Sequence, residues 1–465
     1  MSDIFQFDAG ERVLVIGLGR SGLASIEVLS EHKVTLYATD EKPGSELIDA
    51  VAVANSFGAR FVEPSEIESI LGELTCAVLS PGVPPTSPVV RRLHGANVPV
   101  FGEIELAYRL CKAPIIAVTG TKGKSTTTAL IGHLLRGCGL EVRVGGNIGN
   151  PLIKEVRDVG PDGWVVAEVS SFQLETIRAF KPRVAVLLNI EPDHLDRYHS
   201  MDEYAEAKYR IGANQSMTDW FVGNWDDPRI RALHWHHGDT RVQARQLWFS
   251  LDETEATMYV RDGMLTYAPV AGDPRPVAIV PRDEIPLPGE HNVRNAMAAL
   301  LAALAVGCAP AKLREAICSF APMRHRLETV AEIDGVRYVD DSKATNPGAV
   351  IAALHTFESP IVLIAGGRSK GIGFEACAAP IRERVTALVA IGEAAGAFLE
   401  IAQGIPAVTA TTMEEAVQRA RELAVPGGVV LLSPGCASFD MFASAEDRGE
   451  QFAKAVAALR EPAGA

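Results

Sequence analysis

The chain has 465 residues, of which 47% are hydrophobic; this is too long for one hydrophobic core and fits two or three domains. Its formal net charge of −14 argues against non-specific nucleic-acid binding, which needs clustered cations. Its 7 cysteines include no paired Cys-x-x-Cys, which favours free thiols in a reducing cytoplasm. We expect no signal peptide, and no membrane span, because no apolar run reaches roughly 18 residues.

A glycine turn lies close to the N-terminus. Residues 12–16 predict a strand, Gly17-Leu-Gly-Arg-Ser-Gly22 predicts a turn, and residues 23–29 predict a helix. The next expected strand, residues 34–39, ends at Asp40. This spacing is typical of a dinucleotide-binding fingerprint, although the glycines could instead serve only close packing.

The most informative segment spans residues 115–128. An apolar strand leads into Gly120-Thr-Lys-Gly-Lys-Ser-Thr126, after which a helix is expected. Backbone N–H groups of such a turn and helix N-terminus cradle phosphates, while Lys124 would neutralise β/γ oxygens and Ser125 would hold Mg²⁺. The usual phosphate loop has a glycine where this chain has Val118, so the motif is a tight variant. It predicts an ATP-using enzyme.

Two later segments place ionisable side chains directly after strands. Glu168 follows the strand expected from residue 164, where a Mg²⁺ ligand belongs, although Ser170 or Ser171 could simply cap a helix there. Residues 189–198 include His194, which could contact a metal or a phosphate, and a solvated loop is the alternative.

Other segments carry weaker signals. Lys208 alone looks like an exposed helical lysine, residues 145–150 could be a simple glycine loop, and Asn292 could cap the helix on which Asn295 lies. Cationic segments at residues 324–326, 340–346 and 366–371 could bind anions or be solvated. The histidines of residues 234–237 are interpreted as a surface cluster.

Strands alternate with helices along most of the chain, which predicts parallel sheets covered by helices on both faces. A linking helix is expected at residues 103–110. Residues 241–280 alternate like antiparallel strands and suggest an insertion, and a new α/β unit is expected from about residue 323.

Together these motifs resemble those of one family, the Mur ligases, which form amide bonds with ATP in peptidoglycan precursor synthesis. The resemblance covers nearly the whole chain and rests on residues 119–126, Glu168-Val-Ser-Ser-Phe-Gln173, 189–198, His291-Asn-x-x-Asn295 and Asp341-Ser-Lys-Ala-Thr-Asn346. Within the family the chain is most similar to members that add D-glutamate, because of residues 17–22, Ser-Ser-Phe-Gln-Leu174 and Ser433-Pro-Gly-Cys-Ala-Ser-Phe-Asp440. The sequence Asp-Asn-Pro-Arg, typical of the members that add diaminopimelate or lysine, is not found.

The resemblance implies an α/β protein with three domains. Residues 1–102 would form a Rossmann-like domain that binds the uridine diphosphate of the substrate instead of NAD. Residues 103–322 would form a central P-loop ATPase-like domain, and residues 323–465 a C-terminal Rossmann-like α/β domain that binds the amino acid.

The resemblance also implies the site residues. ATP would be bound by Gly120, Thr121, Lys122, Gly123, Lys124, Ser125, Thr126, Asn295, Arg326 and Asp341. Mg²⁺, expected as two ions, would be held by Ser125, Glu168, His194 and, if carbamylated, Lys208. Substrates would be bound by Leu18, Ser21, Asp40, Gly82, Asn147, Ser170, Gln173, Thr345, Lys370 and Ser438. The reaction itself would depend on Lys124, Glu168, His194, Lys208 and Lys343.

The expected partners are the small molecules UDP-N-acetylmuramoyl-L-alanine and D-glutamate, and we expect a cytoplasmic monomer. The chain departs from the family at Glu41 and Lys42, beside the expected uracil contacts, and at Ala445, where the glutamate pocket usually has an aromatic residue that Phe439 or Phe442 could replace. Two alternatives stay open, a related ligase that adds glutamate to folate and an NAD-dependent oxidoreductase.

Overall fold

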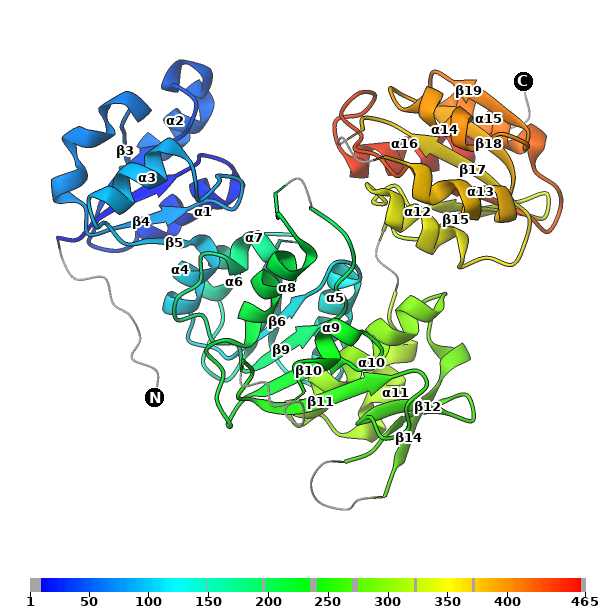
Figure 1. Cartoon of the computed structure of the whole chain (residues 1–465), viewed down its shortest axis with the longest axis horizontal. Coiled ribbons are helices and arrows are strands. Elements are labelled where there is room, and N and C mark those ends of the chain that lie inside the picture. Colours follow the sequence, from blue (N-terminus) through cyan, green and yellow to red (C-terminus); the bar gives the residue numbers. More distant parts are fainter. Residues whose placement is uncertain are drawn as a thin grey trace. The chain divides into compact units, whose positions relative to one another are not determined.

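The computed structural model describes residues 10–147, 149–194, 197–234, 241–269, 275–321, 324–369 and 373–460 (Figure 1). Three β-sheets follow one another along the described chain, and the fold is α/β as expected. Contacts group the first two sheets into one compact unit, which runs to Ile285 and resumes over Arg294–Phe320. The third sheet belongs to a second unit, made of Pro286–Val293 and the chain from Ala321. Among the described residues, no helix is both long and apolar enough to cross a membrane.

The first sheet has five parallel strands in the order β3-β2-β1-β4-β5. This order places β1 at the centre, as in open sheets that bind ligands at the carboxyl ends of their strands. The elements are β1 (Arg12–Ile16), α1 (Arg20–Leu29), β2 (Thr35–Thr39), η1 (Gly44–Glu46), α2 (Ile48–Ser56), β3 (Arg60–Phe61), η2 (Pro64–Ser69), η3 (Leu71–Glu73), β4 (Cys76–Leu79), α3 (Pro88–Gly95) and β5 (Val100–Gly102).

Alternate side chains of this sheet enter two different cores. Val13 and Val15 pack with buried residues of α1, whereas Leu14 and Ile16 pack with buried residues of α3. A strand with both faces covered has to be apolar at every position, because successive side chains point to opposite faces. The uninterrupted apolar run of β1 therefore follows from its place in the middle layer.

The second sheet has nine strands in the order β14-β13-β12-β11-β10-β9-β6-β8-β7. The elements of this part of the chain are α4 (Glu103–Leu110), β6 (Ile115–Thr119), α5 (Lys124–Gly137), β7 (Val142–Gly146), α6 (Leu152–Arg157), β8 (Trp164–Glu168), α7 (Ser171–Leu174), β9 (Val184–Leu187), α8 (Met201–Tyr209), η4 (Arg210–Gly212), β10 (Trp220–Asn224), α9 (Pro228–Arg231), β11 (Arg245–Ser250), β12 (Met258–Arg261), β13 (Met264–Tyr267), β14 (Val277–Pro281), η6 (Arg282–Glu284), α10 (Glu290–Ala305) and α11 (Pro310–Cys318).

The segment interpreted as an insertion is part of this central sheet. Strands β12, β13 and β14 pair in antiparallel fashion, as expected. However, β11 pairs in parallel with both β10 and β12, so the segment extends the sheet at its edge. The insertion interpretation is wrong because the alternating pattern shows one solvated face of a sheet but not which strands lie beside it.

The third sheet has six strands in the order β15-β16-β20-β17-β18-β19, of which only β15 is antiparallel to its neighbour. Helices α12 and α14 pack on one face, and α15 and α16 pack on the other. The elements are β15 (Glu328–Ile333), β16 (Val336–Asp340), α12 (Pro347–Leu354), β17 (Ile361–Gly366), η7 (Glu375–Cys377), α13 (Ala378–Arg384), β18 (Val385–Ile391), α14 (Ala395–Ile401), β19 (Ala407–Ala410), α15 (Met413–Leu423), β20 (Val429–Leu432) and α16 (Ala445–Ala458).

We predict that Gly22→Ala destabilises the first sheet. A Cβ at this position would overlap the carbonyl oxygen of Gly17 and would lie 2.8 Å from Oγ of Ser80. Such overpacking typically costs about 1–3 kcal/mol, which should lower the thermal unfolding midpoint measured by calorimetry. Gly19→Ala is the matched control, since its Cβ would meet nothing within 4 Å and its φ is −72°. Equal midpoints for both variants would contradict this packing role.

Candidate active site

The phosphate loop connects β6 to α5 as the sequence predicts. Gly120 and Gly123 have φ angles of 155° and 78°, which residues with a Cβ rarely adopt. Gly123 is the N-cap residue of α5 and, having no side chain, makes no cap hydrogen bond there. The first N–H groups of the helix can therefore meet an anion, which the helix dipole also favours.

The loop after β9 holds the phosphate loop in place. Asn189 accepts a hydrogen bond from the backbone N–H of Lys122 at 2.8 Å and donates one to the carbonyl of the same residue at 3.1 Å. The ammonium of Lys122 pairs with Glu191, whose backbone N–H donates to the hydroxyl of Thr121 at 3.0 Å. The sequence did not single out Asn189 or Glu191 for this role, although both follow a predicted strand.

Two lysines share one acceptor in this loop. The carbonyl of Gly120 accepts hydrogen bonds from the ammonium groups of Lys124 at 3.0 Å and of Lys208 at 2.9 Å. Lys208 is 1% exposed and lies 4.6 Å from the centre of the Tyr204 ring, so the interpretation as an exposed helical lysine is wrong. Burial, followed by the positive charge of Lys124, holds the pKa of Lys208 well below its usual value.

Glu168 ends β8 on the same edge of the sheet. Strand pairing sets Glu168 opposite Val118, one residue before the end of β6. Its Oε1 accepts a hydrogen bond from the side chain of Asn147 at 2.7 Å, and its Oε2 is buried without a hydrogen-bond partner among the residues that the structure describes. An unsatisfied, buried carboxylate oxygen is costly unless a cation binds it, and Mg²⁺ prefers oxygen ligands.

The helix cap considered as an alternative is also present. Ser170 and Gln173 form a capping box at the start of α7, in which the Ser170 hydroxyl accepts from the Gln173 N–H at 3.2 Å. The same Gln173 side chain accepts from the Ser170 N–H at 2.9 Å. The cap is confirmed, and it leaves Glu168, which precedes the helix, available to a metal.

His194 adopts a strained backbone conformation, with a φ of 54°. Its ring lies 4.8 Å from that of Phe172, and its carbonyl accepts from the N–H groups of Arg197 and Tyr198, each at 3.0 Å. Glu175 holds both of these residues, at 2.6 Å from Arg197 and 2.5 Å from the Tyr198 hydroxyl. Such strain persists only where the surroundings fix the residue, and it often marks functional sites.

Asn295 reaches the phosphate loop from helix α10. A Cβ added to Gly123 would overlap the side-chain oxygen of Asn295, so the two lie in close contact.

Two other segments that the sequence singled out are described only in part. Residues 195–196 and 235–237 lie outside the described residues.

The carboxyl edge of the first sheet brings together the residues expected near the uridine. Asp40 accepts hydrogen bonds from the N–H groups of Leu18 at 2.7 Å and Lys42 at 3.2 Å, so its carboxylate orders both loops. Arg20 of helix α1 donates to the carbonyl of Gly149 at 2.7 Å. This contact joins the glycine turn of the first sheet to the Asn147 loop of the second.

A small pocket lies between the loop after β4 and helix α7. It faces Gln173 and the ion pair of Arg197, and its lining residues are Leu79, Ser80, Pro81, Val83, Pro85, Gly102, Glu103, Ile104, Phe172, Gln173, Thr176 and Arg197. Gly82 belongs to the same loop and is exposed. The pocket therefore adjoins Gly82, one of the residues expected to bind substrate.

The third sheet carries the residues expected to contact the amino acid. Lys343 pairs with Glu446 at 3.2 Å, and Ser438 is buried. Thr345 lies on the same loop as Lys343 and is half-buried, whereas Lys370 lies outside the described residues. Phe442 is buried in the core, whereas Phe439 is 66% exposed, so only Phe439 is free to replace the missing aromatic side chain.

Asp341 and Arg326, expected to contact ATP, lie near each other in this sheet. Burial raises the pKa of Asp341 to about 7, while a hydrogen bond from Ser433 at 3.0 Å and the charge of Arg326 act in the opposite direction. A buried carboxyl group with such a pKa is common at functional sites.

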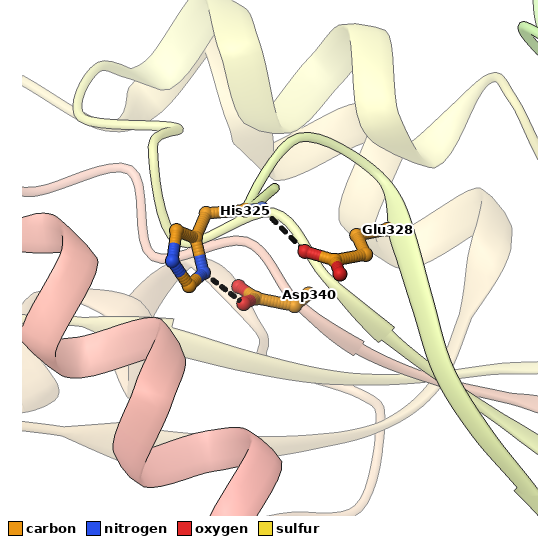
Figure 2. Close-up of side chains that lie close together, drawn as sticks. All are labelled: His325, Glu328 and Asp340. Carbon is orange, nitrogen blue, oxygen red and sulfur yellow. Dashed lines mark hydrogen bonds and ion pairs between the residues drawn. The ribbon is translucent and has the colours of Figure 1, made fainter. Parts of the chain in front are cut away.

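The sequence did not reveal a buried cluster beside Asp341. Figure 2 shows that His325 Nδ1 contacts Asp340 Oδ2, at 2.7 Å, and that the His325 N–H donates to Glu328, also at 2.7 Å. The ligand atoms of the three side chains lie within 4.8 Å of one another, a spacing that could hold a metal. They are already hydrogen-bonded within the cluster, so we interpret it as structural.

The fold and the site define the class of protein: a nucleotide-dependent enzyme whose phosphate loop lies beside a buried lysine and an unpaired carboxylate oxygen. Family models match three successive segments, the Mur ligase MurD-like N-terminal domain at residues 11–102, the Mur ligase middle domain at 118–303, and the Mur ligase glutamate ligase domain at 325–436. The chain belongs to the Mur ligase family.

Curated relatives match over nearly their full length. The chain is 44% identical over 459 residues to the UDP-N-acetylmuramoylalanine–D-glutamate ligase of Pelotomaculum thermopropionicum, covering 97% of this chain and 98% of that one. It is 42% identical over 453 residues to the enzyme of the same name from Geobacter metallireducens, again covering 97% and 98%. Such similarity argues against both the oxidoreductase and the folate alternative.

A solved structure shows the same fold. The UDP-N-acetylmuramate-alanine ligase of Thermotoga maritima matches with a TM-score of 0.60 at 19% identity, covering 97% of this chain and 100% of that one. A likeness at this level of identity shows that the two chains share a fold.

We predict that Glu103, which lines the pocket, makes stability depend on pH. Its Oε1 accepts from the Ile153 N–H at 2.7 Å, its Oε2 is buried without a hydrogen-bond partner, and burial raises its pKa from 4.5 to about 7. Between these values the folded chain keeps a proton that the unfolded chain releases, so stability should fall as pH rises through this window. The free energy of unfolding, measured with urea at pH 5 and pH 8, should lose this pH dependence in Glu103→Gln. Parallel pH profiles for the variant and the unchanged protein would contradict it.

Proposed function

We propose that this chain is an ATP-dependent ligase that joins D-glutamate to UDP-N-acetylmuramoyl-L-alanine and releases ADP and phosphate, in peptidoglycan precursor synthesis. The observation that carries the proposal is the phosphate loop with Lys124 and buried Lys208 on one carbonyl, in a chain 44% identical to a ligase of that name. We also propose that the protein acts as a monomer in the cytoplasm.

The alanyl carboxylate of UDP-N-acetylmuramoyl-L-alanine has to be activated, because a free carboxylate is a poor electrophile at neutral pH. Its oxygen attacks the γ-phosphorus of ATP and forms an acyl phosphate while ADP leaves. The amine of D-glutamate then attacks the acyl carbon, phosphate leaves, and the amide forms. Lys124 and the N-terminus of α5 bind the transferred phosphoryl group, so catalysis rests on positioning and on neutralised charge.

The residues present fit Mg²⁺. Glu168 Oε2 is a buried oxygen without a hydrogen-bond partner, and Ser125 follows Lys124 at the start of α5. We propose that Ser125, Glu168 and His194 hold the ion, which would neutralise phosphate charge. A second ion is part of the proposal and would need a further oxygen ligand.

Ligand pockets complete the proposal. ATP is bound by the phosphate loop with Asn295, Arg326 and Asp341. The uridine diphosphate substrate is bound by Leu18, Ser21, Asp40, Gly82, Asn147, Ser170 and Gln173, and D-glutamate by Lys343, Thr345, Lys370 and Ser438. The proposed domains are residues 1–102, 103–322 and 323–465.

Phosphate release tests the function. The pure protein is given ATP, Mg²⁺, UDP-N-acetylmuramoyl-L-alanine and a panel of amino acids, and we expect turnover with D-glutamate.

We predict that Lys124→Ala loses on the order of 10²–10³ in rate and keeps its unfolding midpoint, because one preorganised contact to the phosphoryl group is removed. Turnover with another amino acid only, or near-normal rates in Lys124→Ala, would refute the proposal. Tight NADH binding without binding of the uridine substrate would favour the oxidoreductase alternative instead.

Lys208 is proposed to carry a carbamate. Carbamylation needs a neutral amine, and burial beside Lys124 favours that form. The reaction joins CO₂ to the amine nitrogen and releases a proton, which turns a cation into an anionic oxygen ligand for Mg²⁺.

We predict that Lys208→Ala is nearly inactive and is partly rescued by acetate or formate, which would supply the missing carboxylate oxygen. Lys208→Arg keeps the cation but cannot form the same carbamate, so it should also fail. Phosphate release with and without the added acid measures both effects. Full activity of Lys208→Arg would show that the carbamate is not needed.

A further inference from the structure

Arg448 is the largest completely buried side chain of the described residues, with 0% exposure. It lies in the first turns of helix α16, on the face that packs against the third sheet. A buried guanidinium is costly unless its donors are satisfied. Its Nη1 and Nη2 are hydrogen-bonded, whereas its Nε has no hydrogen-bond partner among the described residues.

The guanidinium joins two loops. Nη2 donates to the carbonyl of Ser342 at 2.6 Å and to that of Cys436 at 3.1 Å, and Nη1 donates to Cys436 at 3.2 Å. Ser342 lies in the loop after β16, and Cys436 lies in the loop after β20. These strands are neighbours and parallel, so both loops leave the same edge of the sheet.

A third loop packs against the same group. Gly367 follows β17, and a Cβ added to it would lie 3.3 Å from Nη1 of Arg448 and 3.1 Å from the Cβ of Cys436. Strand β17 pairs in parallel with β20, so three successive strands of the sheet end around one guanidinium. Arg448 thus donates hydrogen bonds to two of these loops and packs beside the third.

Gly449, the next residue of the helix, packs closely against neighbouring side chains. A Cβ on Gly449 would overlap His325 Nδ1 and would lie 2.5 Å from Asp340 Oδ2 and from Ser342 Oγ. These atoms belong to the cluster around His325 and Asp340 that Figure 2 shows. Asp340 accepts from the Ser342 N–H at 2.8 Å, so both backbone groups of Ser342 are held from this side.

The charges around Arg448 explain why a cation is tolerated. Burial lowers the pKa of Arg448 to about 10, while the nearby Cys436, Asp440, Asp340 and Asp341 act in the opposite direction, so the side chain stays protonated at neutral pH. A metal ion in the His325 cluster would be repelled by this cation, which supports the structural interpretation of that cluster.

We propose that Arg448 is a positioning residue for the amino-acid pocket: it holds the loops that carry Lys343 and Ser438 at a fixed distance without touching the substrate. Lys343 directly follows Ser342, and Ser438 lies two residues after Cys436. The substrate class, an α-amino acid with a second carboxylate, rests on the proposed function, whereas the joining of the loops does not.

The test compares Arg448→Lys with Arg421→Lys. Lysine keeps the charge but cannot present the planar fork that reaches two carbonyls. Arg421 is the matched control, because it also joins separate segments of this domain, donating to the Leu459 carbonyl at 3.2 Å and to Asp334 at 2.9 Å. Neither partner lies in the loops that follow β16, β17 and β20.

We expect Arg448→Lys to raise the KM for D-glutamate at least about tenfold, since a displacement near 1 Å can cost up to on the order of 10²-fold. The KM for ATP should change much less, because Asp341 is also held by Ser433 and by the Leu432 carbonyl, at 3.0 and 2.8 Å. Arg421→Lys should leave both constants unchanged. An unchanged KM for D-glutamate with a lower kcat in a folded Arg448→Lys protein would overturn the proposal.

Amide hydrogen exchange separates this proposal from the proposed function. Arg448→Lys should speed exchange in residues 341–346, 366–369 and 433–440 together, without ligand, whereas Arg421→Lys should not. If the unchanged protein shows no turnover with D-glutamate but exchange rises in all three loops, the function is wrong and the loop coupling stands. Exchange that rises in no loop, or equally in both variants, overturns the coupling itself.

Discussion

The Gly120 carbonyl, with two lysine ammonium groups on it, is the constraint around which the central site is arranged. One carbonyl oxygen cannot neutralise two cations, and Lys208 is almost completely buried. The low pKa of Lys208 relieves part of the repulsion. Clustered cations of this kind would attract phosphate, as the proposed function requires.

The strand pairings bring two proposed metal ligands to the same edge of the sheet. Thr119 pairs with Leu187 and Val118 with Glu168, so the loops after β6, β8 and β9 leave the sheet at one edge. Glu168 and His194 reach this edge from different loops, each anchored by its own hydrogen bonds. Parallel pairing therefore collects into one site residues that are far apart in sequence.

Local patterns were sufficient for part of this structure. The phosphate loop and the Ser170 cap are short-range motifs, because their glycines and caps act within a few residues, and the Asp40 fingerprint has a fixed spacing, with Asp40 bound to Leu18, 22 residues earlier. The burial of Lys208 and Arg448 was not predictable in this way. Their surroundings come from loops up to about 100 residues away, as in the contact between Arg448 and Ser342, 106 residues apart. The interpretation of residues 241–280 as an insertion was wrong for the same reason, since the pattern of one strand does not show which strand lies beside it.

Lys208 and Arg448 show the same physical solution in two sheets. Where parallel strands end, their loops leave backbone carbonyls that no neighbouring strand pairs, and burial makes such acceptors costly. A buried cation satisfies them, but the number of its donors decides how much it fixes. The ammonium of Lys208 donates to one carbonyl and can still react, whereas the fork of Arg448 joins two loops and is chemically inert. We therefore propose a chemical role for the buried cation of the central sheet and a positioning role for that of the C-terminal sheet.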